Sequence, residues 1–192
     1  NPVEAREASL DTRDTLKMNV PQQVYILSRD QIERANAQTA ADLLTTDGLL
    51  TVQKSQQGGG SPMIRGFESS RVLLVMDNVK MNNLIYRAGH LQNIITVDPS
   101  ILERVEVLYG PSSVSYGSDA LGGVVAFRSK NPVLGDGGKT LFSGNAFMRY
   151  GSANQETTGH VDFNIGGERF ASLTSLSYSN FGDLRSGRRK NP

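Results

Sequence analysis

The sequence predicts an α+β domain with a small mixed sheet and short helices, followed by antiparallel transmembrane β-barrel strands. Between Gln23 and Gln53 the chain has a strand, two helices and a strand in succession. An apolar segment at 72–79 and an alternating segment at 103–109 have the length and composition of sheet strands. After a glycine-rich linker at 135–138, apolar and polar residues alternate over segments of ~10 residues, which is the pattern of membrane-spanning barrel strands.

Composition limits the functions that the chain can have. Its 192 residues suffice for one domain and part of another. With 20 basic and 19 acidic residues the net charge is +1, so no bulk field favours nucleic acid, and we expect no nucleic-acid partner. The absence of cysteine excludes a disulfide framework. No apolar run approaches the ~20 residues of a membrane-spanning helix.

The first half of the chain contains the clearest helix signals. Residues 1–19 are polar and form a lead-in. The segment 23–28 (QVYILS) predicts a strand, and its last residue, Ser28, can start the helix RDQIERA. Thr39 can start a second helix, AADLLTT, which Asp47-Gly48 ends before a short strand at 49–53.

Further strands follow a flexible triple-glycine loop at 58–60. We predict strands over 61–67 and 71–79, then a long polar segment that ends near Asp98. In ERVEVLY, residues 103–109, alternation with period two predicts a half-buried strand. Gly110-Pro111 breaks that strand, and the apolar run 124–127 predicts the next one.

Beyond Pro132 the strands are long and two-sided. One set of positions is apolar and alternates with polar residues: Phe142, Ala146, Met148, Tyr150, Val161, Phe163 and Ile165. His160, Asp162 and Asn164 occupy the opposite face. Gly166-Gly167 predicts a two-residue hairpin, and 169–181 a third strand whose phase slips near Ser175. An ordinary antiparallel sandwich hairpin is the alternative.

Two long motifs occur in the order of a known family. They are the segment 103–128, ERVEVLYGPSSVSYGSDALGGVVAFR, and the pair PMIRGF (62–67) and VLLVMDNV (72–79). Over roughly residues 20–130 the chain closely resembles the plug domain of TonB-dependent outer-membrane receptors. The resemblance implies a lead-in at 1–19, a plug at 20–133, and a linker with the first strands of a roughly 22-stranded barrel at 134–192. The chain would then be a fragment of a larger receptor.

The resemblance also implies a function. Such a receptor is an active transporter in the outer membrane of a Gram-negative bacterium, surrounded by outer-membrane lipid, with a plug that an inner-membrane TonB complex rearranges. We expect haem or haem-protein iron as the ligand, a ferric siderophore as the second choice and cobalamin or another nutrient as the third. No intrinsic cofactor is expected, and a surface lipoprotein is a further candidate partner. The TonB-contacting box is not recognisable in Val3-Glu4-Ala5-Arg6.

Motifs of enzymes are missing from the sequence. The two histidines, His90 and His160, lie far apart and neither has metal-ligand spacing around it. The glycine loop at 58–60 is followed by no GK[ST], so it is not a phosphate loop. We therefore expect no enzyme activity.

The segment 81–93, MNNLIYRAGHLQN, is the candidate ligand site. In similar receptors the corresponding loop points outward and forms the floor of the ligand site. It offers Tyr86, Arg87, His90, Gln92 and Asn93. The likeness to haem- and haemoglobin-type receptors, including those of Bacteroidetes, implies that His90 ligates haem iron while Arg87 pairs with a propionate. The alternative for His90 is a hydrogen bond within a packed loop.

Two further sets of side chains carry competing interpretations. Met76 and Met81 near His90 would allow a copper site, although Met76 lies in an apolar strand and suits core packing better. The resemblance implies that Arg65, Glu103, Arg104 and Glu106 form ion pairs between plug and barrel, and solvated strand faces are the alternative. Many receptors of this family carry arginine at the position of Tyr109. The contact that this arginine makes is therefore not expected in this chain.

A function from another class is a soluble periplasmic binding or adaptor domain built on the plug fold alone. It would require residues 139–181 to form a soluble hairpin.

Overall fold

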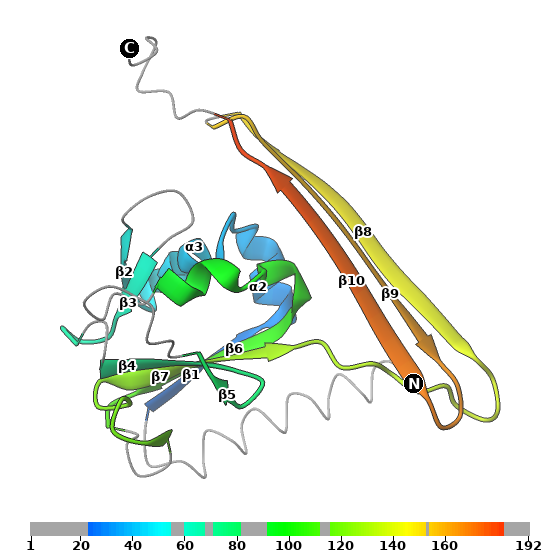
Figure 1. Cartoon of the computed structure of the whole chain (residues 1–192), viewed down its shortest axis with the longest axis horizontal. Coiled ribbons are helices and arrows are strands. Elements are labelled where there is room, and N and C mark those ends of the chain that lie inside the picture. The colour runs from blue at the N-terminus through cyan, green and yellow to red at the C-terminus, as the bar shows by residue number, and fades with distance from the viewer. Residues whose placement is uncertain are drawn as a thin grey trace. The chain divides into compact units, whose positions relative to one another are not determined.

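The computed structural model describes residues 23–54, 60–67, 71–81, 92–111, 116–152 and 154–182. The chain divides into two compact units, and the division falls between Ser129 and Lys130. Figure 1 shows a mixed α/β unit and a unit of long strands. No helix in the described ranges is long and apolar enough to cross a membrane.

The first unit is built on a five-stranded mixed sheet with the strand order β1-β6-β7-β4-β5. Strand β4 runs parallel to β7, and the other neighbouring pairs are antiparallel. The strands are β1 (Gln23–Ser28), β4 (Val72–Met76), β5 (Val79–Lys80), β6 (Leu102–Tyr109) and β7 (Gly123–Ser129). A two-stranded ribbon, β2 (Thr51–Lys54) with β3 (Gly60–Met63), accompanies them. The predicted α+β class with a small mixed sheet is confirmed.

Two short helices, α2 (Arg29–Ala35) and α3 (Ala40–Thr45), begin where the sequence predicts. At α2 the Ser28 backbone N–H donates to Gln31 Oε1 over 2.9 Å, which is half of a capping box. At α3 the Thr39 hydroxyl accepts from the Asp42 backbone N–H over 3.1 Å. These caps satisfy backbone donors that a short helix would otherwise leave unpaired.

The hydrophobic core lies on both faces of the central strands. On the face that the helices cover (Figure 1), Val105, Val107 and Phe127 pack with helix residues such as Leu44. On the opposite face a smaller cluster contains Leu73, Val75, Leu108, Ala120, Val124 and Ala126. Strand β7 is therefore apolar on both sides, as expected for a strand between two partners inside a sheet.

The predicted strands 61–67 and 71–79 are each a shorter strand followed by a tight turn. Arg65 and Gly66 have φ of 49° and 84°, and Ile64 and Phe67 exchange backbone hydrogen bonds across them. Asp77 and Asn78 have φ of 47° and 69°, which turns the chain back so that β5 pairs with β4. Consecutive positive φ angles are the signature of hairpin turns, and Asn is one of the few residues that adopts them readily.

The second unit is a three-stranded antiparallel sheet with the order β10-β9-β8. Its strands are β8 (Leu141–Gly151), β9 (Glu156–Gly166) and β10 (Ala171–Asn180). The two-residue hairpin expected at Gly166-Gly167 is wrong, because residues 167–170 form a four-residue connection in which Gly167 N–H donates to Phe170 O. The β9–β10 register runs without a shift, and the expected slip in the apolar pattern near Ser175 is present, because Leu173 lies opposite Asn164 on one face and Leu176 opposite Val161 on the other.

We expect Gly123→Ala to destabilise the first unit. Gly123 has a φ of 154°, and an added Cβ would lie 2.5 Å from Leu108 O and 2.8 Å from Ile64 Cδ1. Overpacking of this kind costs about 1–3 kcal/mol. Denaturant unfolding measures the loss, and Gly159→Ala, whose Cβ would meet nothing within 4 Å, is the matched control. Equal unfolding midpoints for the two variants would contradict the prediction.

Candidate functional site

The three-stranded sheet has one apolar, exposed face, which we call the outer face. The cross-strand register places these side chains on the same side: Phe142, Ala146, Met148, Tyr150, Val161, Phe163, Ile165, Leu176 and Tyr178. Phe142 is 71% exposed and Met148 84%. A continuous apolar face of this extent on three long strands needs an apolar environment.

The opposite, inner face is polar along β9, and there it is buried. Five alternate positions of β9 carry the polar side chains Glu156, Thr158, His160, Asp162 and Asn164, and all five are buried. Polar side chains in such places need partners, because an unpaired buried polar group costs free energy. Along β9 the buried polar positions thus alternate with outer positions that are apolar from Val161 to Ile165.

Asp162 is the centre of the inner-face network. It accepts from Lys130 Nζ over 2.6 Å and from Asn145 Nδ2 over 3.2 Å, and lies 3.1 Å from His160 Nε2. The His160 ring is held by Ser177 Oγ at 2.6 Å and by stacking on Phe147, with ring centroids 5.2 Å apart. The sequence predicted that His160 faces the inside of the barrel together with Asp162 and forms a hydrogen bond to the plug. The imidazole does lie on the inner face with Asp162, but its partners Ser177 and Asp162 both belong to the second unit.

A second buried ion pair lies near the β8–β9 turn. Arg149 Nη2 donates to Glu156 Oε1 over 2.7 Å, and Thr158 Oγ1 donates to the same oxygen over 2.8 Å. The Glu156 side chain has no exposed surface, and its Oε2 lacks a hydrogen-bond partner. Arg149 is thus the cation that neutralises this carboxylate, and the pair is sensitive to loss of either side chain.

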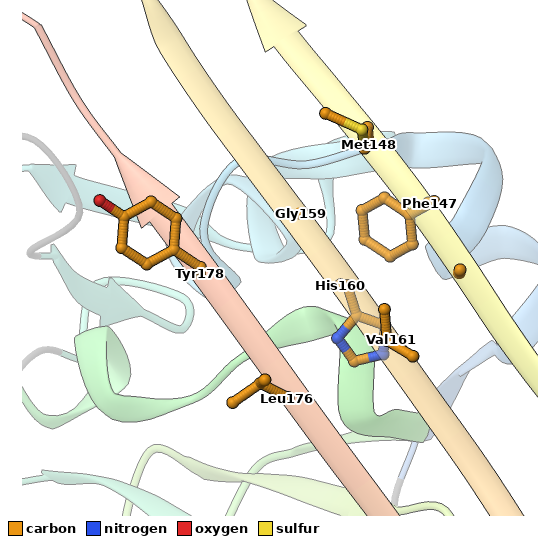
Figure 2. Close-up of a pocket in the computed structure, with 8 residues that line it drawn as sticks. Phe147, Met148, Gly159, His160, Val161, Leu176 and Tyr178 are labelled. Atoms are coloured by element: carbon orange, nitrogen blue, oxygen red, sulfur yellow. The ribbon is translucent and has the colours of Figure 1, made fainter.

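A shallow apolar groove lies on the sheet where β9 carries Gly159 instead of a side chain. Figure 2 shows Met148 and Tyr178 on the strands on either side of this glycine. The groove has a volume of about 460 Å³ and is lined by Ala146, Phe147, Met148, Gly159, His160, Val161, Leu176 and Tyr178. Its lining is nearly all apolar, and in the described residues no group of three or more acidic, histidine or cysteine side chains could hold a metal ion.

The predicted ligand segment falls largely outside the described residues. Tyr86, Arg87 and His90 lie there, and so do the side chains of Gln92 and Asn93, whose backbone forms the first turn of a 3₁₀ helix, Gln92–Thr96. Met76 and Met81 are described, and both pack against the core of the first unit. That packing accounts for them without a copper ion.

Of the four charges expected at the plug surface, Arg104 and Glu106 bind each other within β6. Arg104 Nε lies 2.6 Å from Glu106 Oε1, and Arg128 Nε lies 3.9 Å from the same oxygen. Arg128, which the sequence analysis missed, also donates to Asn78 Oδ1 over 2.7 Å. Arg128 lies opposite Arg104 in the β6–β7 register, and the sequence alone does not give this pairing. Glu103 is exposed.

Arg65 connects its tight turn to two strands. Its Nη2 donates to Gln23 Oε1 over 2.7 Å, and its guanidinium lies over the Tyr109 ring, 5.4 Å from the centroid. Tyr109 in turn donates its hydroxyl to Leu49 O over 2.9 Å. Burial raises the pKa of Tyr109, and Tyr25 adds to this while Arg65 opposes it, so the phenol remains a donor at neutral pH.

A mixed-sheet domain joined to strands with an apolar outer and a polar inner face defines the class of plug-and-barrel receptors. The family model described as "TonB-dependent Receptor Plug Domain" matches residues 16–124. The chain belongs to this family. The expected location, the outer membrane of a Gram-negative bacterium, is thereby confirmed, and the family is one of receptors, as expected.

Relatives with different printed ligands resemble the chain. The ferrioxamine B receptor of Salmonella typhimurium is 32% identical over 98% of this chain and 26% of its own length. The hemin receptor of Yersinia pestis is 31% identical over 81% of this chain and 22% of its own. Among solved structures, the pyoverdine outer membrane receptor of Pseudomonas aeruginosa PAO1 has a TM-score of 0.67 and 20% identity, and covers 83% of this chain and 22% of its own. The chain spans about a quarter of these proteins' length and corresponds to the plug and first strands, as the sequence predicted.

We expect Arg149→Leu to destabilise the full receptor strongly, because it leaves the buried Glu156 carboxylate without its cation. Breaking a buried pair in this way costs about 3–5 kcal/mol. The double variant Arg149→Leu/Glu156→Leu should recover most of the loss, since no buried charge remains. Thermal or denaturant unfolding in detergent measures both, with the exposed Arg169→Leu as control. A double variant no better than the single one would refute this account of the pair.

Proposed function

We propose that the chain is the plug and first barrel strands of an active transporter that takes up an iron-containing ligand, with haem or haem-protein iron favoured. The observation that carries the proposal is the division of the second unit into an apolar outer face and a buried polar inner face, directly after a plug domain. The apolar face suits lipid and the polar face suits the inside of a barrel. The same observation disfavours a soluble adaptor domain, which would expose Phe142 and Met148 to water.

The dimensions of the outer face support membrane insertion. From Phe142 to Tyr150 the strand covers about 27 Å at ~3.4 Å per residue. At a tilt of 35–45° this distance spans roughly 20 Å across the membrane, close to the ~25 Å apolar band of such barrels. Aromatic side chains lie at both ends, Phe142 and Phe170 at one and Tyr150 and Tyr178 at the other, and all four are exposed. Rings at the two borders of the band are typical of membrane barrels.

The sheet itself implies further strands. In the described sheet, β8 and β10 each have one paired edge. Unpaired backbone groups in lipid cost several kcal/mol each, so these edges require partners in the membrane. A closed barrel of the size that the family resemblance implies, roughly 22 strands, supplies them.

The plug would act as the gate of this barrel. Ligand would bind from outside, and the TonB complex of the inner membrane would then act on the segment before β1 and rearrange the plug. Ion pairs between plug and barrel through Arg65, Glu103, Arg104 and Glu106 are part of this proposal. No covalent chemistry is required of the chain, and outer-membrane lipid and a surface lipoprotein complete the set of expected partners.

Haem is the preferred ligand because of the segment that contains Tyr86, Arg87, His90, Gln92 and Asn93. A neutral imidazole suits haem iron, and a guanidinium suits a propionate. The hemin receptor among the relatives supports this choice, while the ferrioxamine B receptor supports a ferric siderophore as the alternative. Cobalamin or another nutrient is the third candidate.

We expect Phe163→Arg to destabilise the inserted receptor by about 2–4 kcal/mol, because it places a charge near the middle of the lipid-facing surface. Ser175→Arg is the matched change on the inner face of the neighbouring strand and should be mild. Unfolding from lipid vesicles measures both variants. Equal tolerance at the two positions would remove the barrel assignment.

We expect His90→Ala to shift the Soret band of bound haem and to weaken haemin binding, because an axial nitrogen is lost. The measurement is a haemin titration of the intact receptor. His160→Ala is the matched control, since His160 is the other histidine of this chain and lies in the inner-face network. It should lower stability and leave the spectrum unchanged. An unshifted spectrum for His90→Ala, or no haemin binding by the wild type, would favour a siderophore.

A further inference from the structure

The segment that joins the two units lies along the inner face of β9. From here on we call residues 130–135 the linker; they lead into the glycine-rich segment 135–138 that the sequence indicated as a linker. Lys130 Nζ contacts Asp162 Oδ2 at 2.6 Å, Val133 is bonded to Asn164, and Gly135 N–H donates to Gly167 O over 3.0 Å. The contact points advance along β9 in the same direction as the linker. The linker is therefore held at three places in succession.

The central contact resembles the pairing of two strands. Val133 N–H donates to Asn164 Oδ1 over 2.9 Å, and Asn164 Nδ2 donates to Val133 O over 3.0 Å. One side-chain amide thus satisfies both backbone groups of one residue. The Asn164 side chain is buried. Removal of its amide would leave the backbone N–H and C=O of Val133 without these hydrogen bonds, which costs free energy.

Close backbone approach fixes the far end of the linker. A Cβ on Gly166 would stand 2.1 Å from Val133 O, and a Cβ on Gly135 would stand 2.8 Å from Gly166 O. These distances leave room for glycine alone. The contact is therefore specific to this pair of glycines and independent of the two side-chain contacts.

An ion pair between Lys130 and Asp162 holds the N-terminal end of the linker. The side chains of Lys130 and Asp162 are 13% and 4% exposed, and Asn145 and His160 bind the same carboxylate. Removal of Lys130 from this place would leave Asp162 without its cation in a buried site, which opposes release. In the first unit, by contrast, Arg65 binds Gln23, the first residue of β1, through an exposed hydrogen bond.

The direction of load also differs at the two ends. Strand β1 pairs antiparallel with β6, so a pull on the chain before Gln23 opens its hydrogen bonds one after another. The linker contacts are spaced along β9, so they share a force that reaches the linker through Lys130. The Arg65–Gln23 bond at β1 is exposed and the Lys130–Asp162 pair is largely buried, so we expect the β1 end to open before the linker is released.

We propose that Lys130, Asp162 and Asn164 are positioning residues for transport, which keep the linker bound to β9 throughout the cycle. The rearrangement of the plug then ends before residue 130. This inference rests on the proposed function in one respect, namely that the plug rearranges during transport. The binding of the linker in the resting receptor does not depend on it, and the two can be tested separately.

Hydrogen exchange of the full resting receptor tests the contact itself. In Asn164→Leu the amides of Val133 and Gly135 should exchange about tenfold faster or more, which corresponds to about 1.4 kcal/mol of opening free energy. Asn145→Leu removes an inner-face amide that does not touch the linker and should leave these amides protected. Equal, fast exchange in the wild type and in Asn164→Leu would overturn the proposal without any bearing on transport.

A reversible crosslink tests whether the linker stays bound during transport. Cysteines at 130 and 162, in a receptor without other cysteines, are joined by a short reagent that a reductant cleaves, and uptake of haemin and of ferrioxamine B by cells is measured. The crosslink replaces the Lys130–Asp162 contact, so the crosslinked receptor should take up its ligand as the wild type does, and after reduction the same receptor, which lacks both side chains, should take up less. A cysteine pair at 23 and 65, joined in the same way, should lose uptake until reduced.

Loss of uptake on crosslinking 130 to 162, with recovery on reduction, would overturn the proposal whatever the second pair does. Absence of haemin and ferrioxamine B uptake by the wild-type receptor would instead count against the proposed ligands, and the hydrogen-exchange result would still decide whether the linker is anchored.

Discussion

The strict two-sidedness of β9 is the constraint on which the second unit depends. A strand in a membrane must satisfy its backbone groups through neighbouring strands, and its side chains must suit lipid on one side only. Val161 and Phe163 meet the second condition, and the five buried polar side chains of β9 occupy the alternate positions. Because the side-chain period is two, a slip of one residue would place Asp162 and Glu156 in lipid. The register of the sheet is consequently fixed by chemistry on both of its faces.

The plug unit follows a different rule, in which apolar burial on both faces of the central strands fixes the arrangement. β6 and β7 lie between other strands, so their apolar side chains are buried on either face. The charged residues of β6, Arg104 and Glu106, are only partly buried and bind each other. Tight turns with positive φ then allow short strands to fit beside long ones. The plug thereby has an apolar interior and polar contacts at its surface, which suits the proposed role as a gate.

Much of this was predictable from sequence because the signals are local. Ser28 and Thr39 begin the helices through caps that need only the next few residues, and alternation identified the long strands. The errors arose where backbone conformation departs from residue preference. Arginine at 65 rarely adopts a positive φ, so its turn was taken as strand. The Arg128 contact and the linker contacts were missed because they join residues far apart in the sequence. For the ligand segment around His90, the resemblance to a family was the only guide.

Buried polar contacts suit the junction between a gate and a barrel better than apolar packing would. Apolar burial is non-directional, so an apolar linker could slide along β9 with little change in free energy. The Asn164 amide and the Asp162 carboxylate accept only one arrangement of Val133 and Lys130. Such contacts add little net stability compared with a well-packed apolar surface, but displacement of either group leaves an unsatisfied buried partner. The same chemistry that makes the inner face of β9 polar therefore also fixes where the linker begins.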